Sequence, residues 1–198
     1  MARMVLERRG SQIKAHRNTS KAFEGLKMIV IFKIRRELLG TVQRDLSRPH
    51  RFAWERVGFL SGPVGPLERE GVVILAHAYH PIDDDDYIES DEAAAMMGSV
   101  AIRKALQFAH SNQTSMFHVH RHDHLGRPSF SNLDLRENAK FMPDFSNVCP
   151  EFPHGALVLS MNSFAGICWH PDILTPISIT EVIVVGAPME VISHGTFR

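Results

Sequence analysis

Four histidines alternate with other residues between positions 118 and 124: His118, His120, His122 and His124. The chain has 12 histidines among 198 residues, so a third of them fall in this one short segment. The preceding residues, 115–117, predict the end of a β-strand. Because residues two apart in a strand point to the same face, His118 and His120 would aim both imidazoles at one point. This alternation requires a fold in which a strand delivers polar side chains to a shared site.

A carboxylate follows the histidines after a short loop. Gly126-Arg127-Pro128 predicts that loop, and Ser131 and Asp134 come after it, three residues apart. Asp134 can therefore return to the histidines as a third ligand. Two histidines and one carboxylate, with a fourth position left for water, are typical of a catalytic zinc site. We expect one zinc ion per chain, held by His118, His120 and Asp134.

The rest of the chain predicts a single α+β (mixed α/β) domain over residues 27–198, with a curved mixed β-sheet flanked by helices. Residues 79–90 and 142–155 are expected to be loops, and loops on a rigid scaffold often grip a substrate. Apolar runs predict strands at 28–32, 57–60, 72–78, 156–161, 166–169 and 177–185. Amphipathic periodicity and capping residues predict helices at 35–46, 91–109 and 132–141.

The zero net charge conceals two halves of opposite sign. Residues 1–51 hold 13 Lys and Arg against 4 Asp and Glu, whereas residues 52–198 hold 9 against 18. We interpret residues 1–26 as a solvated, partly ordered basic arm rather than one that binds nucleic acid. The four consecutive aspartates, Asp83–Asp86, predict a solvated loop, because they repel one another and lack the ligand spacing of a calcium loop.

Cysteine usage and hydropathy indicate the compartment. The two cysteines, Cys149 and Cys168, form no Cys-x-x-Cys pair, which favours a reducing environment. The best apolar run near the N-terminus, Met28–Phe32, is too short to direct export or to span a membrane. We therefore expect a soluble, cytoplasmic protein without a membrane partner.

Three motifs, in this order, resemble the JAB/MPN metalloprotease family, which carries the JAMM motif, and most of all its compact prokaryotic JAB members. The family pattern is an upstream Glu, then His-x-His, a spacer and Ser-x-x-Asp. Glu55–Gly62 resembles the family's Glu-x-x-Gly-x-Leu-x-Gly segment, His118–His120 matches the second element, and Ser131–Asp134 matches the last. The resemblance covers residues 28–190 and implies a JAB/MPN-like fold.

The spacer departs from the family pattern. Ten residues separate His120 from Ser131, more than the family usually has; starting from His122 or His124 would leave eight or six. Spacing therefore leaves open which histidine pair binds the metal. We prefer His118 and His120 because they follow directly on the apolar strand. His122 and His124 would then lie at the rim, foremost as exposed side chains.

The resemblance also implies an activity and a role for each residue. The protein would be a zinc metallopeptidase that cleaves an amide or isopeptide bond, with the C-terminus of a ubiquitin-like protein or its conjugate as substrate. Glu55 would take the proton from a zinc-bound water and deliver it to the leaving nitrogen. Ser131 would donate a hydrogen bond to the developing oxyanion.

Two other functions stay open at this point. The first is a non-catalytic MPN-type scaffold that binds partners through its sheet and helices, although such relatives usually lack the ligand set. The second is another metal-dependent hydrolase, a phosphoesterase or nuclease, because His-x-His also opens the PHP phosphoesterase pattern. There the motif lies near the start of the chain, whereas here it lies past the middle.

Overall fold

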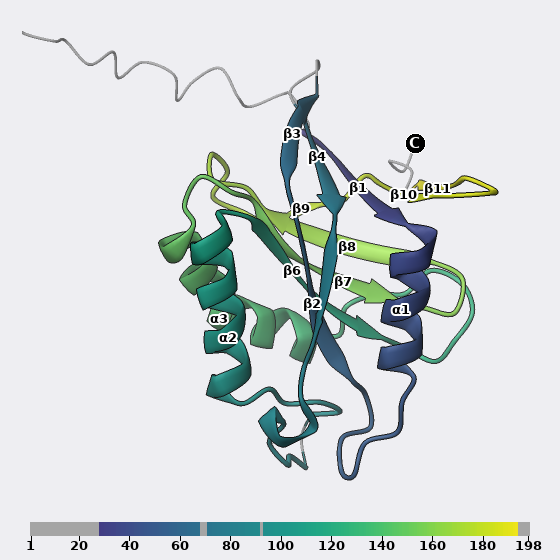
Figure 1. Ribbon diagram of the computed structural model, residues 1–198, viewed down its shortest axis with the longest axis vertical. Coiled ribbons are helices and arrows are strands. Elements are labelled where there is room, and N and C mark those ends of the chain that lie inside the picture. Colours follow the sequence, from purple (N-terminus) through teal and green to yellow (C-terminus); the bar gives the residue numbers. More distant parts are fainter. Residues whose placement is uncertain (1–27, 68–70, 92, 194–198) are drawn as a thin grey trace, which may run out of the picture.

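The computed structural model describes residues 28–67, 71–91 and 93–193. Within these residues the chain forms three α-helices and two mixed β-sheets (Figure 1). The predicted α+β class is confirmed, but the strands are divided between two sheets instead of forming one. The expected basic arm, residues 1–26, lies outside the described residues.

The first sheet has five strands in the order β11-β10-β1-β4-β3. Its central strand runs parallel to both neighbours, β10 and β4. Alternate residues of that strand, Val30, Phe32 and Ile34, are buried, as the period of two requires for a strand with one face on a core. The strands are β1 (Ile29–Arg35), β3 (Val64–Leu67), β4 (Gly71–Ala76), β10 (Glu181–Val185) and β11 (Glu190–Ser193).

The second sheet has six strands in the order β5-β2-β6-β7-β8-β9. The histidine-bearing strand β6 lies in its interior, antiparallel to β2 on one side and parallel to β7 on the other. Its backbone is therefore hydrogen-bonded along both edges. The strands are β2 (Val57–Gly62), β5 (Ala78–Pro81), β6 (Ser115–Arg121), β7 (His154–Leu159), β8 (Phe164–Trp169) and β9 (Ile177–Ser178).

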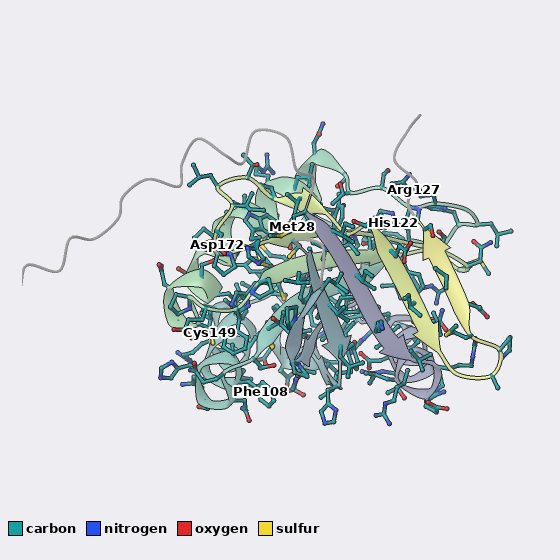
Figure 2. All side chains as sticks on the ribbon, turned by 90° about the horizontal axis from the view of Figure 1, so that it is seen from above. Met28, Phe108, His122, Arg127, Cys149 and Asp172 are labelled. Carbon is teal, nitrogen blue, oxygen red and sulfur yellow. The ribbon has the colours of Figure 1, made fainter. Side chains whose placement is uncertain are left out.

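The three helices cover opposite faces of the six-stranded sheet. α1 (Arg36–Leu46) contributes to a core that both sheets share, whereas α2 (Ser99–Asn112) and α3 (Asn132–Val148) pack on the other face (Figure 1). Side chains fill the space between these layers (Figure 2). No helix among the described residues combines the length and the apolarity needed to cross a membrane.

Strand β6 contributes to both cores because its side chains alternate. Phe117 and Val119 belong to the core shared by the two sheets, and Met116 belongs to the core beneath α2 and α3. His118 and His120 follow Met116 by two and four residues, so they lie on the same face of the strand as Met116. Both imidazoles therefore project toward α2 and α3, as the period of two predicts.

The predicted strand 177–185 is two strands, and they belong to different sheets. β9 pairs with β8, whereas β10 pairs with β1. The chain changes sheets at Thr180, whose backbone N–H donates to Val30 O (2.8 Å) and whose hydroxyl accepts the Val30 N–H (3.2 Å). The apolar pattern runs on through this point because both sheets face the same core.

The predicted strand 72–78 corresponds to β4 and the first residue of β5, whereas the rest of β5, residues 79–81, lies in the stretch 79–90 that was predicted to be a loop. The break falls at His77, whose N–H donates to Ser61 O (2.8 Å). Two strands were missed altogether. β3 follows Gly62 in a stretch that contains Pro63 and Pro66, and it pairs antiparallel with β4, whereas β11 pairs antiparallel with β10.

Two helix boundaries also differ from the prediction. The helix expected from residue 91 begins at Ser99, because residues before it are tied to other segments: Ile88 N–H donates to Met96 O (2.9 Å). The helix expected to end at Phe141 continues to Val148, so residues 142–148 are not loop. Burial of Met142 and Phe145 against the sheet outweighs the backbone hydrogen bond lost at Pro143.

Candidate metal centre

His118 and His120 stand side by side on the face of β6 that is covered by α2 and α3. Only 7% of His118 and 2% of His120 is exposed. Their ring centroids lie 5.8 Å apart and the rings are nearly parallel, at 28°. Because β6 is hydrogen-bonded on both edges, the position of both rings is set by the sheet.

Neither ring nitrogen of His118 or of His120 has a hydrogen-bond partner in the described part of the chain, although all four nitrogens are buried. Leaving a buried donor or acceptor unpaired costs about 1–3 kcal/mol, so such groups are rare in folded proteins. Burial lowers the pKa of His118 to about 3, and His120 adds to the effect. His118 is therefore neutral at physiological pH, and neutral imidazole is the form that binds a metal. The orphaned nitrogens fit a metal site.

Asp134 approaches His120 from the start of α3. Ser131 and Asp134 form a capping box: Ser131 N–H donates to Asp134 Oδ2 (2.7 Å), and Asp134 N–H donates to Ser131 Oγ (3.1 Å). Asp134 Oδ2 also lies 3.5 Å from His120 Nε2. Burial by itself would raise the pKa of Asp134, but the contacts with His120 and Ser131 hold it below its usual range. Asp134 is therefore a fixed carboxylate anion beside the histidines.

Glu55 immediately precedes β2 and faces the same point. The N–H groups of Trp54 and Glu55 both donate to Ala94 O, at 2.8 and 3.2 Å, which fixes the backbone here. Burial raises the pKa of the Glu55 carboxyl, and Asp134 and Asp123 raise it further while His120 opposes them. A carboxyl group with a raised pKa is a better proton acceptor than a free one, as a general base requires.

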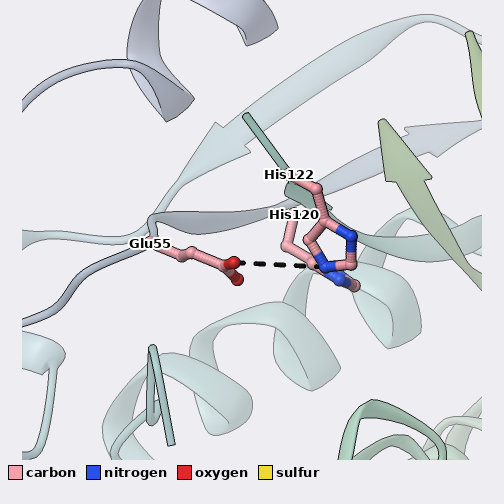
Figure 3. A group of neighbouring side chains, drawn as sticks. All are labelled: Glu55, His120 and His122. Atoms are coloured by element: carbon pink, nitrogen blue, oxygen red, sulfur yellow. Dashed lines mark ion pairs between the residues drawn. The ribbon is translucent and has the colours of Figure 1, made fainter. Parts of the chain in front are cut away.

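His122 lies closer to this centre than the sequence predicted. The antiparallel register pairs Val57 with His120 and, continued by two residues, sets Glu55 opposite His122. His122 Nε2 lies 4.0 Å from Glu55 Oε1, and one ligand atom each of Glu55, His120 and His122 fall within 4.8 Å of one another. Figure 3 shows the Glu55 carboxylate pointing toward both rings. The histidines continue to alternate past the end of the strand, and this pattern could have predicted that His122 belongs to the site.

His124, by contrast, is exposed, and its Nδ1 lies 3.0 Å from Leu125 O. It does not line the cavity that contains the other three histidines of the segment. The expectation of exposed side chains therefore holds for His124 and not for His122, of which 22% of the side chain is exposed.

Apart from His124, the side chains described above line one cavity of about 700 Å³, which we call the histidine cavity. A volume of this size falls within the range of small-molecule and substrate pockets. Residues 93–97 and the facing sides of α2 and α3 form the remaining walls, and neither was predicted to line a site. The five predicted site residues all line this cavity, and His122 lines it too: Glu55, His118, His120, Ser131 and Asp134. The predicted ligands His118, His120 and Asp134 do not place their donor atoms within 4.8 Å of one another, whereas Glu55, His120 and His122 do.

The four aspartates, which we call the acidic loop (residues 83–86), are arranged differently. Residues 84–86 form a short 3-10 helix, η1. Asp84 pairs with the buried Arg56, and Lys104 pairs with both Asp83 (2.8 Å) and Asp86 (2.6 Å). Cationic side chains therefore pair with three of the four carboxylates, and the segment predicted to be a solvated loop is a short helical turn with ion pairs.

No protein-family model matches this chain, and no curated protein sequence matches it either. The resemblance to the JAB/MPN family therefore rests on the three motifs and stays a prediction. What the structure adds is that residues from those motifs, far apart in the sequence, line the same cavity.

Proposed function

We propose that the protein is a zinc-dependent metallopeptidase that hydrolyses an amide or isopeptide bond. The observation that carries this proposal is the pair of buried histidines, His118 and His120, whose ring nitrogens have no hydrogen-bond partner among the described residues and which share a cavity with Asp134 and Glu55. Two imidazoles and a carboxylate are the donor set of a catalytic zinc site, which keeps one position open.

His118, His120 and Asp134 are the residues that would hold the ion. A bound zinc ion supplies Lewis-acid chemistry and lowers the pKa of a water that it binds to about 7. The ionised Asp134 and the neutral His118 are already in the protonation states that such binding needs, so no proton has to leave either group first.

Glu55 would move the proton. Hydrolysis adds the hydroxyl group of water to the carbonyl carbon and a hydrogen to the leaving nitrogen. The Glu55 carboxylate would accept the proton from water and return it to that nitrogen, and its raised pKa favours the first half of this transfer. Glu55 and the first turn of α3 line the same cavity, where a substrate carbonyl would bind.

Ser131 would stabilise the oxyanion that develops on the carbonyl oxygen. Its Oγ accepts the Asp134 N–H (3.1 Å), which orients the hydroxyl while leaving its hydrogen to be donated. The same contact makes Ser131 the cap of α3, so one side chain would serve both the helix and the reaction.

The substrate class follows from the motif resemblance. We propose that the scissile bond lies at the C-terminus of a ubiquitin-like protein, in a precursor or in a conjugate. Both cysteines, Cys149 and Cys168, are free and buried. Free thiols suit a reducing compartment, so we place the activity in the cytoplasm.

The test combines metal analysis with cleavage. Elemental analysis of the purified full chain should give one zinc ion per chain, and the protein should cleave a ubiquitin-like fusion at the junction. His120→Ala should lose both zinc and cleavage, because His120 lies beside every other candidate ligand. The matched control is His124→Ala, which should retain both, since His124 does not line the cavity.

Two results would contradict the proposal. A wild-type protein without zinc, even after zinc is added back, would remove the catalytic centre. A zinc protein that hydrolyses a nitrophenyl phosphate ester but no peptide or isopeptide would indicate a different hydrolase.

A further inference from the structure

The histidine cavity contains two overlapping sets of metal donors. The inner set is His118, His120 and Asp134, which the proposed function uses. The outer set is Glu55, His120 and His122, whose ligand atoms lie within 4.8 Å of one another. Each set consists of two imidazoles and one carboxylate, and His120 belongs to both.

The outer set is at least as closely spaced as the inner one. The rings of His120 and His122 have centroids 5.0 Å apart, compared with 5.8 Å for His118 and His120. Glu55 Oε1 lies 4.0 Å from His122 Nε2, and Asp134 Oδ2 lies 3.5 Å from His120 Nε2. The two sets therefore offer the same donor chemistry, but among the described residues only the outer set places one ligand atom of each member within 4.8 Å of the others.

His122 is held in place, although it lies beyond the end of β6. Its N–H donates to Leu159 O (2.8 Å), which extends the pairing with β7 by one step. The loop that follows is tied to the turn between β7 and β8: Met161 N–H donates to His124 O (3.0 Å), and Gly126 N–H donates to Asn162 Oδ1 (2.8 Å). The long spacer between the histidines and Ser131 thus fixes His122 beside Glu55.

The two sets differ in their access to solvent. His118, which only the inner set contains, is 7% exposed. The side chain of Asp134, the other member that only the inner set contains, is 22% exposed, and those that only the outer set contains, Glu55 and His122, are 28% and 22% exposed. The difference lies in His118: an ion must reach a buried imidazole to complete the inner set, whereas the members that only the outer set contains are both partly exposed.

We propose that Glu55, His120 and His122 form a second, outer position for the same divalent cation, an alternative to the inner position at His118, His120 and Asp134. Because both positions need His120, one ion occupies one of them at a time, and the chain binds a single ion. This inference rests on the proposed function for the role of the inner position, but the binding that it describes does not require any activity.

The outer position has a consequence for Glu55. A carboxylate that is a ligand of the ion cannot at the same time accept a proton as the base. Occupancy of the outer position therefore gives a loaded but inactive protein, and movement of the ion to the inner position releases Glu55. The protein would thus switch between two zinc-bound states: an inactive one with the ion at the outer position and an active one with the ion at the inner position.

The experiment measures zinc affinity of the full chain by competition with a chromophoric chelator. The key variants are His118→Ala and, in case the truncation disturbs the core, His118→Phe. Loss of this ligand should weaken zinc binding by about 100-fold or more. Even the loss of a residue that only hydrogen-bonds to a metal ligand can weaken binding by up to about 100-fold. Binding of one ion per chain should nevertheless remain, because the outer set is intact.

A second substitution then identifies the remaining ligands. His118→Phe/His122→Ala should bind no zinc, because only His120 and separate carboxylates are left. His118→Phe/His124→Ala, the matched control, should bind zinc as His118→Phe does. The visible absorption of the cobalt-substituted proteins gives a second readout: the spectrum of His118→Phe should differ from that of the wild type, and that of His124→Ala should not.

Either of two results would overturn the inference: a folded His118→Phe that binds no zinc, or a His118→Phe/His122→Ala protein that binds it as well as His118→Phe. Failure of the proposed function is recognised separately. A protein that shows the expected binding pattern but cleaves no substrate would overturn only the metallopeptidase, whereas a cleaving wild type with a zinc-free His118→Phe would overturn only the outer position.

Discussion

The histidine cavity and the acidic loop both gather ionisable side chains, yet they differ in whether those side chains already have partners. In the acidic loop, Arg56 and Lys104 pair with three of the four aspartates. In the cavity, the buried ring nitrogens of His118 and His120 have no hydrogen-bond partner among the described residues. A dense run of charged residues therefore says less about a site than a few buried groups that the fold leaves unpaired.

The same contrast separates buried histidines from one another. His154 is buried, as His118 is, but its Nδ1 accepts the Met116 N–H (3.2 Å) and its Nε2 lies 3.2 Å from Cys149 O. It therefore serves as a structural residue that links the start of β7 to β6. Burial is common to both histidines, and only the presence of partners distinguishes the structural residue from the candidate ligand.

The largest expected effect is on catalysis. Glu55→Gln should lower kcat for the fusion substrate by about 10²- to 10⁴-fold, because general acid–base transfer typically contributes that much. Zinc should remain at the inner position, since His118, His120 and Asp134 are unchanged. Steady-state kinetics and elemental analysis on the same preparation check both points. Asp85→Asn, which removes a carboxylate from the acidic loop, should leave both values unaltered; cleavage by Glu55→Gln at the wild-type rate would disprove the role of Glu55.

A smaller effect compares the two kinds of buried histidine through stability. In the presence of a chelator, His154→Phe should lower the free energy of unfolding by about 1–3 kcal/mol, because the buried Met116 N–H loses its acceptor. His118→Phe should leave it unchanged or raise it, since the imidazole has no hydrogen bond to lose and its neighbours Phe59 and Phe141 are aromatic. Urea unfolding measures both. Equal destabilisation by the two substitutions would show that His118 has a structural partner after all.

The free energy of unfolding at low pH should depend on the buried His154. Burial lowers its pKa to about 4 in the folded protein, whereas the unfolded chain takes up the proton near pH 6.5. The unfolded state therefore binds more protons between these values, and the metal-free protein should lose stability as the pH falls, by about 1.4 kcal/mol per pH unit for this group. The slope of unfolding free energy against pH should be smaller for His154→Phe than for the wild type. Identical slopes would mean that His154 is not buried in its neutral form.

The smallest effect tests the acidic loop. Asp84→Asn should lower the urea midpoint, because Arg56 is only 2% exposed and loses the carboxylate that it contacts. Asp85→Asn, the neighbouring control, should not, since neither Arg56 nor Lys104 pairs with it in the described residues. Zinc content should be the same in both variants. A fall in zinc content with Asp84→Asn would show that the acidic loop contributes to the metal site, as the histidine cavity does.

Part of the candidate site was predictable because it depends on local backbone geometry. The alternation of His118 and His120 places both rings on one face of a strand wherever that strand packs. The spacing of Ser131 and Asp134 produces a capping box, which needs no contact beyond the first turn of α3. Similarly, the amphipathic pattern of residues 35–46 predicted α1 almost to the residue.

The remainder depended on which segments meet. Residues 177–185 have the pattern of one apolar strand, but the chain passes from one sheet to the other where the backbone N–H and the hydroxyl of Thr180 bond to the backbone of Val30. α3 continues through Pro143 because Met142 and Phe145 are buried against the six-stranded sheet. In neither case does the local sequence contain the deciding contact, because the partner lies far along the chain.

The sequence by itself determined that this protein presents two imidazoles from one strand and a carboxylate from the next helix, because periods of two and capping boxes are set within a few residues. Only the tertiary structure decided that, among the described residues, the ring nitrogens of His118 and His120 have no hydrogen-bond partner while those of His154 have them, and that His122 faces Glu55. Those outcomes depend on the register between β2 and β6 and on the neighbours that packing brings to each ring. A side chain's type and direction are local properties, whereas its partners are supplied by the rest of the fold.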